Sequence, residues 1–303
     1  AVVGIPNFKM TKTRNKFHCF SKLQFGFVNS GSTEQNIIRV VAISEYSLLK
    51  GDDCYFGLQD VSRAYDSVEL KCGKKLALQR MHTPARLISQ YEQFEEAAWD
   101  RIMTAEGVSD GYRPRRGLPQ GGEESPQQWA CVYDPLLSAM EEAVAEEGVC
   151  VRGWEDRMVV CQGVVFADDA LWIGSTASSM GSKLQFASDV FNFMGPDMSV
   201  PKTLGYRIVG ASNTQPQQHT VTVTDRHNNT SDTVHIKSSD DTNNTELLRH
   251  LGVYFKSGKR GGRIVCDQVI ESAERSIDNL CKKNLFFHGG TLVTSMVIMR
   301  RCV

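Results

Sequence analysis

The chain has 303 residues, of which 41% are hydrophobic, so it is long and apolar enough to bury a sizeable core and to hold two or three subdomains. Its formal net charge is −1, and bulk charge therefore gives no indication of a nucleic-acid partner. Nine scattered cysteines and the lack of an apolar run long enough to span a bilayer exclude a fully paired disulfide scaffold and a membrane-spanning chain, so we expect an intracellular protein, nuclear or cytoplasmic.

The first half of the chain alternates helices with short strands. Apolar side chains recur at helical spacing over residues 34–49, which predicts a helix that Gly51 ends. Residues 54–58 are typical of a short strand, and residues 66–103 predict mainly helix. A proline in the first turn favours a further helix over residues 125–147.

The second half mixes the same elements in an irregular order. Residues 158–173 indicate a hairpin-like pair of strands, and residues 178–194 indicate a helix. Two strands around a polar turn are expected over residues 220–237, a short strand over 251–255, and an amphipathic helix over 267–283. There are no internal repeats, and this mixture favours an α+β fold over a doubly wound parallel sheet.

Three pairs of adjacent aspartates stand in different settings. Asp240–Asp241 lies in a polar loop and has no functional interpretation. Asp52–Asp53 follows Gly51, but it comes at the end of a predicted helix with no strand before it, so we interpret it as a loop. Only Asp168–Asp169 has strand-forming runs on both sides, which places it at the tip of a predicted hairpin. Adjacent carboxylates in an apolar setting need a cation to neutralise them.

A further acidic residue, Asp60, ends the strand-forming run that includes Phe56. If this strand pairs with the hairpin, Asp60 and Asp168 can face one another across the sheet edge. Two such carboxylates suit two Mg²⁺ ions about 3.5–4 Å apart, the arrangement of two-metal phosphoryl transfer. The alternative interpretation is that Asp60 only terminates a strand.

An ordered set of short motifs resembles the series found in reverse transcriptases. Residues 116–126, Arg-Gly-Leu-Pro-Gln-Gly-Gly-Glu-Glu-Ser-Pro, resemble the family's G-x-P-Q-G-x-x-x-S-P motif. The other resemblances, in chain order, are Gln24–Phe27 with Gly31–Thr33 in the fingers, Asp60 with Ala64–Asp66 in the first palm motif, Phe166–Asp169 as aromatic-x-Asp-Asp, Pro201–Thr203 in the next palm motif, and His250–Val253 in the primer grip. The series is most similar to that of the non-LTR (LINE-type) retrotransposon branch, and it leads to the hypothesis of an RNA-directed DNA polymerase.

The resemblance implies roles in nucleotide transfer for several of these residues. Asp60 and Asp168 would be metal ligands supported by Asp169, with Mg²⁺ as the cofactor and Mn²⁺ as an alternative. Lys202 is the candidate to neutralise or protonate the leaving pyrophosphate, against the alternative of a solvated surface lysine. Tyr65 resembles the aromatic gate that excludes a ribose 2′-hydroxyl, against the alternative of a core tyrosine.

Five further positions are assigned to substrate contacts by the same resemblance. Gln120 and Gly121 would lie by the nascent base pair, where a glycine lets the backbone approach closely. Arg63 is included among the substrate-binding residues, and Leu251 and Gly252 would form the primer grip. The implied partners are an RNA template, a DNA primer and deoxynucleoside triphosphates, with no membrane partner, while the oligomeric state is unknown.

The family resemblance also implies an architecture. It is an α+β fold with the right-hand arrangement of polymerases: an antiparallel palm sheet with helices, partial fingers and the start of a thumb. The expected domains are partial fingers at residues 1–53, palm at 54–255 with fingers-proximal helices within 66–115, and the start of a thumb at 256–303.

Three alternatives remain at this point. A truncated or decayed copy would bind RNA without polymerising, and Val28-Asn29, where the family usually has a basic residue, is consistent with it. A non-catalytic RNA-binding scaffold would be expected to lose the metal carboxylates, which are present. A viral RNA-dependent RNA polymerase is the weakest alternative, because its Gly-Asp-Asp would have to be the loop at residues 51–53.

Overall fold

The computed structural model describes residues 20–28, 31–143, 148–152, 158–211, 220–225, 229–239 and 248–255. The expected helix at 267–283 and the start of the thumb at 256–303 lie outside these ranges, as does the Asp240–Asp241 pair. The predicted boundaries between fingers, palm and thumb stay predictions.

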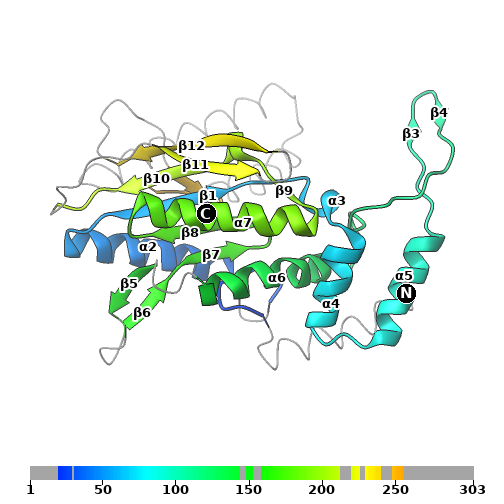
Figure 1. The fold of residues 1–303 in the computed structure, drawn as a ribbon, viewed down its shortest axis with the longest axis horizontal. Coiled ribbons are helices and arrows are strands. Elements are labelled where there is room, and N and C mark those ends of the chain that lie inside the picture. The colour runs from blue at the N-terminus through cyan, green and yellow to red at the C-terminus, as the bar shows by residue number, and fades with distance from the viewer. Residues whose placement is uncertain are drawn as a thin grey trace, which may run out of the picture.

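A six-stranded sheet forms the centre of the described structure (Figure 1). Its strands lie in the order β11 (Thr220–Asp225), β12 (Thr230–Ser238), β10 (Leu204–Ile208), β1 (Cys54–Gln59), β8 (Asp169–Gly174) and β7 (Gly163–Phe166). Only β10 and β12 pair in parallel, and the other neighbours are antiparallel. The expected α+β class and largely antiparallel sheet are therefore confirmed.

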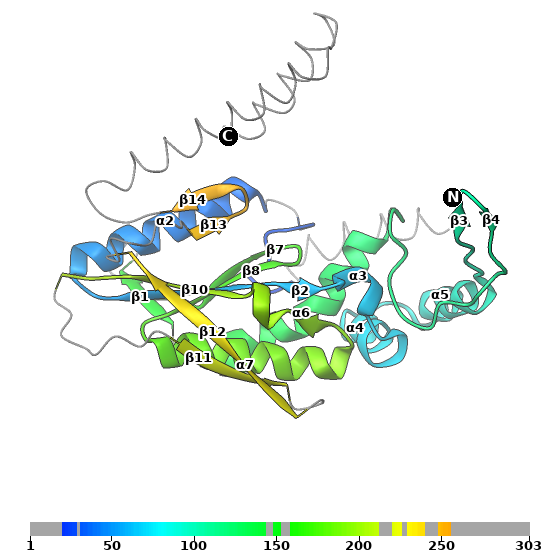
Figure 2. The same cartoon turned by 90° about the horizontal axis from the view of Figure 1, so that it is seen from above.

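Helices cover both faces of the sheet (Figure 2). On one face lie α6 (Ser125–Ala143) and α7 (Ala177–Met194), and on the other lies α2 (Thr33–Lys50) with the hairpin of β13 (Leu248–His250) and β14 (Val253–Phe255). Strand β8 shows how the sequence serves both layers: Ala170 and Trp172 join the core cluster under α6 and α7, whereas Leu171 and Ile173 join the cluster under α2. This alternation follows from the period-two geometry of a strand, so both faces of β8 are buried.

The remaining elements surround one end and one edge of the sheet. They are β2 (Val61–Ser62) paired with β9 (Asp197–Met198), α3 (Ala64–Ser67), a π-helical turn (Leu70–Lys75), α4 (Leu76–Arg80), α5 (Ala85–Ala97), β3 (Met103–Thr104) paired with β4 (Gly107–Val108), β5 (Val149–Arg152) paired with β6 (Met158–Cys161), and a 3₁₀ turn (Val200–Lys202). The β3–β4 hairpin extends away from the sheet beyond α5 (Figure 1).

Local signals account for the ends of the long helices. The hydroxyl of Ser32 accepts the amide of Gln35 at the start of α2, and Gly51 ends that helix in the left-handed conformation with φ 78°. Thr176 and Ser179 form a reciprocal capping box at the start of α7. These caps fix where the helices begin and end relative to the strands that follow.

Most of the expected elements are confirmed, some of them only in part. The helices at 34–49 and 178–194 and the strands at 54–58 and 220–237 are present within a few residues. The helix expected over 125–147 is described to Ala143, and residues 144–147 lie outside the described ranges. Of the strand expected over 251–255, residues Val253–Phe255 are present as β14, whereas Leu251 and Gly252, with φ of 50° and 83°, form the turn that joins it to β13.

Candidate active site

Two sheet strands bring three aspartates together at one end of the sheet. In the antiparallel pairing of β1 with β8, Gln59 lies opposite Ala170, so Asp60 leaves β1 beside Asp169 at the start of β8. The backbone of Asp60 is fixed by the segment before β10: its N–H donates to Thr203 Oγ1 at 3.3 Å, and its carbonyl accepts the N–H of Ser199 at 2.9 Å. The predicted pairing of the Asp60 strand with the hairpin is confirmed.

Asp168 lies in the two-residue turn between β7 and β8. Phe166 pairs with Asp169 across this turn, and Ala167 adopts the left-handed conformation with φ 61°. The Ala167 amide donates to Gln24 Oε1 at 3.2 Å, and its carbonyl accepts the indole N–H of Trp129 at 3.1 Å. Asp168 therefore extends from a turn whose backbone is held by hydrogen bonds on both sides.

Negative charge accumulates at this end of the sheet. Partial removal from water raises the pKa of the Asp169 carboxyl, and repulsion from the carboxylates of Asp168 and Asp60 raises that pKa further. Lys202 supplies a counter-charge, but its Nζ is 3.9 Å from Asp60 Oδ2 and its side chain is 74% exposed. Such an exposed pair neutralises little charge, so the three carboxylates favour an added cation.

The chemistry of these donors suits a hard divalent cation. All three side chains offer carboxylate oxygens, the ligands that Mg²⁺ prefers, and their mutual repulsion falls when a cation binds. Within the described ranges, however, no group of three or more His, Cys, Asp or Glu side chains could hold a metal ion as it stands. The donor set thus fits a metal in its chemistry without forming a finished cage.

Tyr65 lies close to the carboxylates and on top of a buried aromatic column. Its ring stacks on that of Trp129, with centroids 5.6 Å apart and planes 21° apart, and the column continues through Tyr133 to Phe191. Loss of water around the ring raises the pKa of the Tyr65 hydroxyl, and the charge of Asp168 adds to the effect. Tyr65 is half-buried, and its ring has one face packed against Trp129.

The loop before α6 lies beside the segment that carries Tyr65. The amide of Leu118 donates to the Tyr65 carbonyl at 2.7 Å, and Gln120 Nε2 donates to Asp66 Oδ1 at 2.8 Å. Gly121 has φ 83° with open space where a Cβ would stand, so the loop needs glycine there for its backbone conformation. Arg63, also left-handed with φ 49°, is exposed at the start of α3.

A cavity of about 560 Å³ joins the carboxylates to the expected primer grip. Asp168 and Asp169 line it from the β7–β8 turn, and Leu251 and Gly252 line it from the turn between β13 and β14. Thr33 at the start of α2 completes one wall. The structure thus brings the pair Asp168–Asp169 together with the pair Leu251–Gly252, which lies more than 80 positions later in the sequence.

Three buried side chains that support this site were given no individual role by sequence reasoning. Gln24 accepts from the amides of Gly26 and Ala167 through one oxygen, and Trp129 donates to Ala167. His250 Nε2 lies 2.9 Å from Asn36 Oδ1, which ties the β13–β14 hairpin to α2, and burial lowers the pKa of His250 to about 4. Gln24 and His250 lie inside motifs that are visible in the sequence. Those motifs marked the two positions but did not indicate what their side chains contact.

The second aspartate pair has a structural role. Asp53 lies in the loop between α2 and β1, where its carboxylate is 2.5 Å from Arg207 Nη2 and accepts the amide of Gly210 at 2.9 Å. Both side chains are almost fully buried, at 6% and 4% exposed. The interpretation of Asp52–Asp53 as a loop is confirmed.

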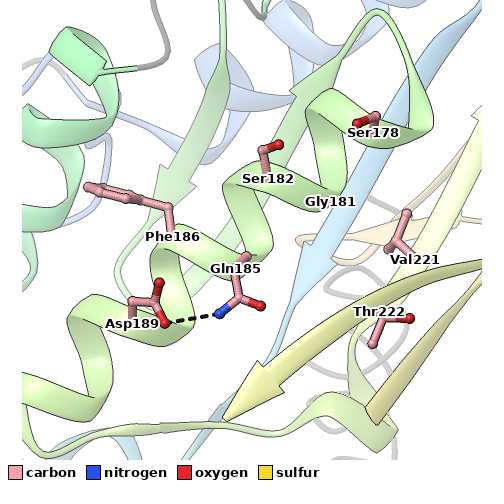
Figure 3. Close-up of a pocket in the computed structure, with 8 residues that line it drawn as sticks. All are labelled: Ser178, Gly181, Ser182, Gln185, Phe186, Asp189, Val221 and Thr222. Carbon is pink, nitrogen blue, oxygen red and sulfur yellow. Dashed lines mark hydrogen bonds between the residues drawn. The ribbon is translucent and has the colours of Figure 1, made fainter. Parts of the chain in front are cut away.

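A separate groove of about 480 Å³ lies between α7 and β11 (Figure 3). Gln185 spans it: its amide donates to Asp189 and to the carbonyl of Thr224, both at 2.9 Å, and its oxygen accepts the Thr224 amide at 2.7 Å. These bonds attach the edge strand to the helix, so we interpret the groove as a packing seam and not as a second active site.

The chain resembles a known protein family and a known retrotransposon protein in sequence. A family profile described as "Reverse transcriptase (RNA-dependent DNA polymerase)" matches residues 2–235. The chain is 25% identical over 161 residues to the "Retrovirus-related Pol polyprotein from type-1 retrotransposable element R2" of Nasonia vitripennis. That alignment covers 53% of this chain and 15% of the polyprotein, so the chain spans a small part of its relative.

Solved structures of telomerase are similar in fold. Telomerase from Candida tropicalis in complex with a TWJ fragment of telomeric RNA has a TM-score of 0.51 and 12% identity, covering 90% of this chain and 41% of that chain. Telomerase from Candida albicans in complex with such a fragment has a TM-score of 0.48 and 12% identity, covering 72% of this chain and 34% of that chain. At such identity the first likeness shows the fold alone.

The family assignment therefore rests on the profile match, which covers most of the chain. In the part of the chain that the structure describes, no helix has the length and apolar content needed to cross a bilayer. The weaker match to the R2 element agrees with the non-LTR branch indicated by the motif series. The chain belongs to the reverse transcriptase (RNA-dependent DNA polymerase) family.

Proposed function

We propose that this chain is the polymerising part of an RNA-directed DNA polymerase that extends a DNA primer on an RNA template. One observation carries the proposal: β1 ends beside the β7–β8 turn, so that Asp60 stands next to Asp169 while Asp168 and Asp169 line a cavity of about 560 Å³. Because the chain spans 15% of its R2 relative, the template, primer and activity of the whole protein are part of this proposal.

The carboxylates are the proposed metal ligands. Reverse transcriptases generally use divalent metal ions. We assign Mg²⁺ to Asp60 and Asp168, with Asp169 in support, because three carboxylates gather here: burial raises the pKa of Asp169, and the charges of Asp168 and Asp60 raise it further. Bound divalent ions would supply charge stabilisation for the attacking primer oxygen and the leaving pyrophosphate. The protein's own contribution is the register of β1 and β8, which fixes where these oxygens stand.

Lys202 and Tyr65 are the proposed contacts to the incoming nucleotide. Lys202 is 74% exposed and its Nζ is 3.9 Å from Asp60, so its ammonium is free to turn toward a triphosphate and offset its charge. Tyr65 presents a ring supported from behind by Trp129, which suits a rigid barrier against a ribose 2′-hydroxyl. Arg63 is exposed on the same segment and is assigned to the triphosphate or template.

The primer and the nascent base pair are assigned to two loops. Leu251 and Gly252 line the cavity opposite the carboxylates, where they would support the primer end. Gln120 and Gly121 would lie against the nascent base pair, and the bond from Gln120 to Asp66 holds this loop to the gate segment. The domain boundaries and a nuclear or cytoplasmic location belong to the same proposal.

Primer extension on an RNA template tests the proposal. The parent is compared with Asp168→Ala and with Asp52→Ala, a matched control that removes an exposed carboxylate from the Asp52–Asp53 pair. We expect the parent to extend with dNTPs and Mg²⁺ and much more weakly with rNTPs. Asp168→Ala should lose on the order of a thousandfold in rate because it removes charge stabilisation at the reacting atoms, and Asp52→Ala should keep the parent rate.

Each contrary result identifies an alternative. A folded parent that binds RNA but does not extend the primer would favour a truncated or decayed copy. Loss of extension in Asp52→Ala, with Asp168→Ala active, would move the metal site to the Gly-Asp-Asp loop and favour an RNA-dependent RNA polymerase. Equal use of dNTPs and rNTPs would contradict the gate assignment of Tyr65 alone.

A further inference from the structure

Ala167 holds an unfavourable backbone conformation next to Asp168. Its φ of 61° lies in the left-handed region, which an alanine rarely adopts because its Cβ crowds the backbone. A residue stays in such a conformation only when its surroundings hold it there. The position of Asp168 therefore depends on whatever fixes the two peptide groups of Ala167.

Two buried side chains fix those peptide groups from opposite ends. Gln24, 4% exposed, accepts the Ala167 amide at 3.2 Å, and Trp129, fully buried, donates its indole N–H to the Ala167 carbonyl at 3.1 Å. That carbonyl belongs to the peptide bond that leads into Asp168. The bond from Trp129 therefore acts on the peptide unit that carries the Asp168 backbone amide.

The same indole also supports the gate. The ring of Tyr65 stacks on that of Trp129 in α6, with the two ring centroids 5.6 Å apart. The ring face of Trp129 thus contacts Tyr65, the residue assigned to nucleotide choice. Its N–H contacts the β7–β8 turn that carries Asp168, here called the carboxylate turn. These are two separable contacts of one residue.

We infer that Trp129 is a positioning residue that couples the nucleotide gate to the carboxylate turn, with its ring supporting Tyr65 and its N–H fixing the Ala167 carbonyl beside Asp168. This inference rests on the proposed function, because it takes its meaning from the roles of Tyr65 and Asp168 there. If Trp129 only filled the core, substituting it would change stability. The substitutions would not then change metal binding and nucleotide choice independently of one another.

Two substitutions separate the contacts. Replacing Trp129 with benzothienylalanine by site-specific incorporation keeps the shape of the ring and removes only the N–H donor. Trp129→Leu removes both the donor and the aromatic surface under Tyr65. Tyr133→Phe is the matched control, because it alters the next ring of the column and removes a buried hydroxyl for which the described structure shows no hydrogen-bond partner.

Two measurements are made on each folded variant, with near-UV circular dichroism as the test of folding. The first is Mn²⁺ binding by electron paramagnetic resonance, which does not depend on activity. The second is the ratio of dNTP to rNTP incorporation. We expect the benzothienyl variant to bind Mn²⁺ about tenfold more weakly, since it leaves a buried carbonyl without its donor, and to keep the parent ratio within about twofold.

Trp129→Leu should lose about as much Mn²⁺ affinity and also lower the dNTP to rNTP ratio by about tenfold or more, because the gate loses its support. Tyr133→Phe should match the parent in both. The inference is overturned if the benzothienyl variant binds Mn²⁺ like Tyr133→Phe, or if no variant changes the ratio. A parent that binds no Mn²⁺ overturns it too.

The failure of the proposed function would look different. A parent that binds Mn²⁺ but does not extend a primer would contradict the polymerase proposal, whereas tenfold weaker Mn²⁺ binding in the benzothienyl variant would still support the role of Trp129 at the turn. If Trp129→Leu does not fold, the benzothienyl variant alone decides the donor's role, because it preserves the packing of the column.

Discussion

Gly26 lies where the fingers motif contacts the carboxylate turn, and Gly26→Ala should damage catalysis far more than stability. A Cβ at Gly26 would stand 2.2 Å from the Ala167 amide nitrogen and 3.0 Å from Ala167 Cα. Both are backbone atoms, so no side chain can rotate away to make room. The gap to the nitrogen must widen by about 1.2 Å to reach ordinary contact at 3.4 Å.

The size of that shift sets the expected effect. A misplacement of about 1 Å in a reacting group costs roughly a hundredfold in rate, and the displaced turn carries Asp168 directly after Ala167. Overpacking of this kind costs typically about 1–3 kcal/mol of stability. We therefore expect Gly26→Ala to stay folded at 25 °C while primer extension falls about a hundredfold.

Gly57→Ala is the matched control for this prediction. Gly57 lies in β1, but the atoms nearest to a Cβ there belong to the side chains of Met180 at 3.1 Å and Leu184 at 3.3 Å, which can adjust. Single-turnover primer extension and thermal melting should be measured on both variants. Parent-like extension by Gly26→Ala, or an equal loss in Gly57→Ala, would refute the argument that contact with the turn controls the rate.

Three further predictions follow from single contacts. Tyr65→Ala should lower the dNTP to rNTP incorporation ratio by about a hundredfold in single-nucleotide extension, and an unchanged ratio would return Tyr65 to the core. Arg207→Met should cost about 3–5 kcal/mol in denaturant unfolding because it removes the guanidinium counter-charge of the buried Asp53 carboxylate, and Mn²⁺ binding should not change. Burial lowers the pKa of His250 to about 4, so only the unfolded histidine takes up a proton as the pH falls from about 6.5 to 4. The folded state therefore loses about 3 kcal/mol of stability over this range. His250→Gln should remove this part of the pH dependence in melts at pH 7.5 and 4.5, and an unaltered dependence would contradict the prediction.

Sequence reasoning succeeded where the signal was local. Asp60 follows a strand-forming run and Asp168 stands between two such runs, so strand periodicity alone indicated the end of β1 and the β7–β8 turn. Gly51 likewise indicated the end of α2, because a helix commonly stops at a left-handed glycine. Each of these features is determined within about ten residues of chain.

The supporting contacts could not be predicted because they join distant parts of the chain. Trp129 meets Ala167 across 38 positions, Gln24 meets Ala167 across 143, and His250 meets Asn36 across 214. Such pairs follow from how layers pack, which periodicity does not encode. The start of the strand expected over 251–255 was misplaced by two residues for the same reason: apolar and aromatic residues favoured a strand, but the hairpin required Leu251 and Gly252 to turn before β14.

One carboxylate stands at each end of strand β1, Asp53 before it and Asp60 after it, and the two should respond differently to ionic strength. At one end, the buried pair of Asp53 with Arg207 is shielded from solvent, so added monovalent salt should hardly weaken it. At the other end, Asp60 and Lys202 are exposed at 42% and 74%, and their charges are open to screening. Rising potassium chloride should therefore compete with divalent ions at Asp60 while the attachment of β1 to β10 stays intact, which makes salt a means of emptying the site without unfolding the sheet that holds it.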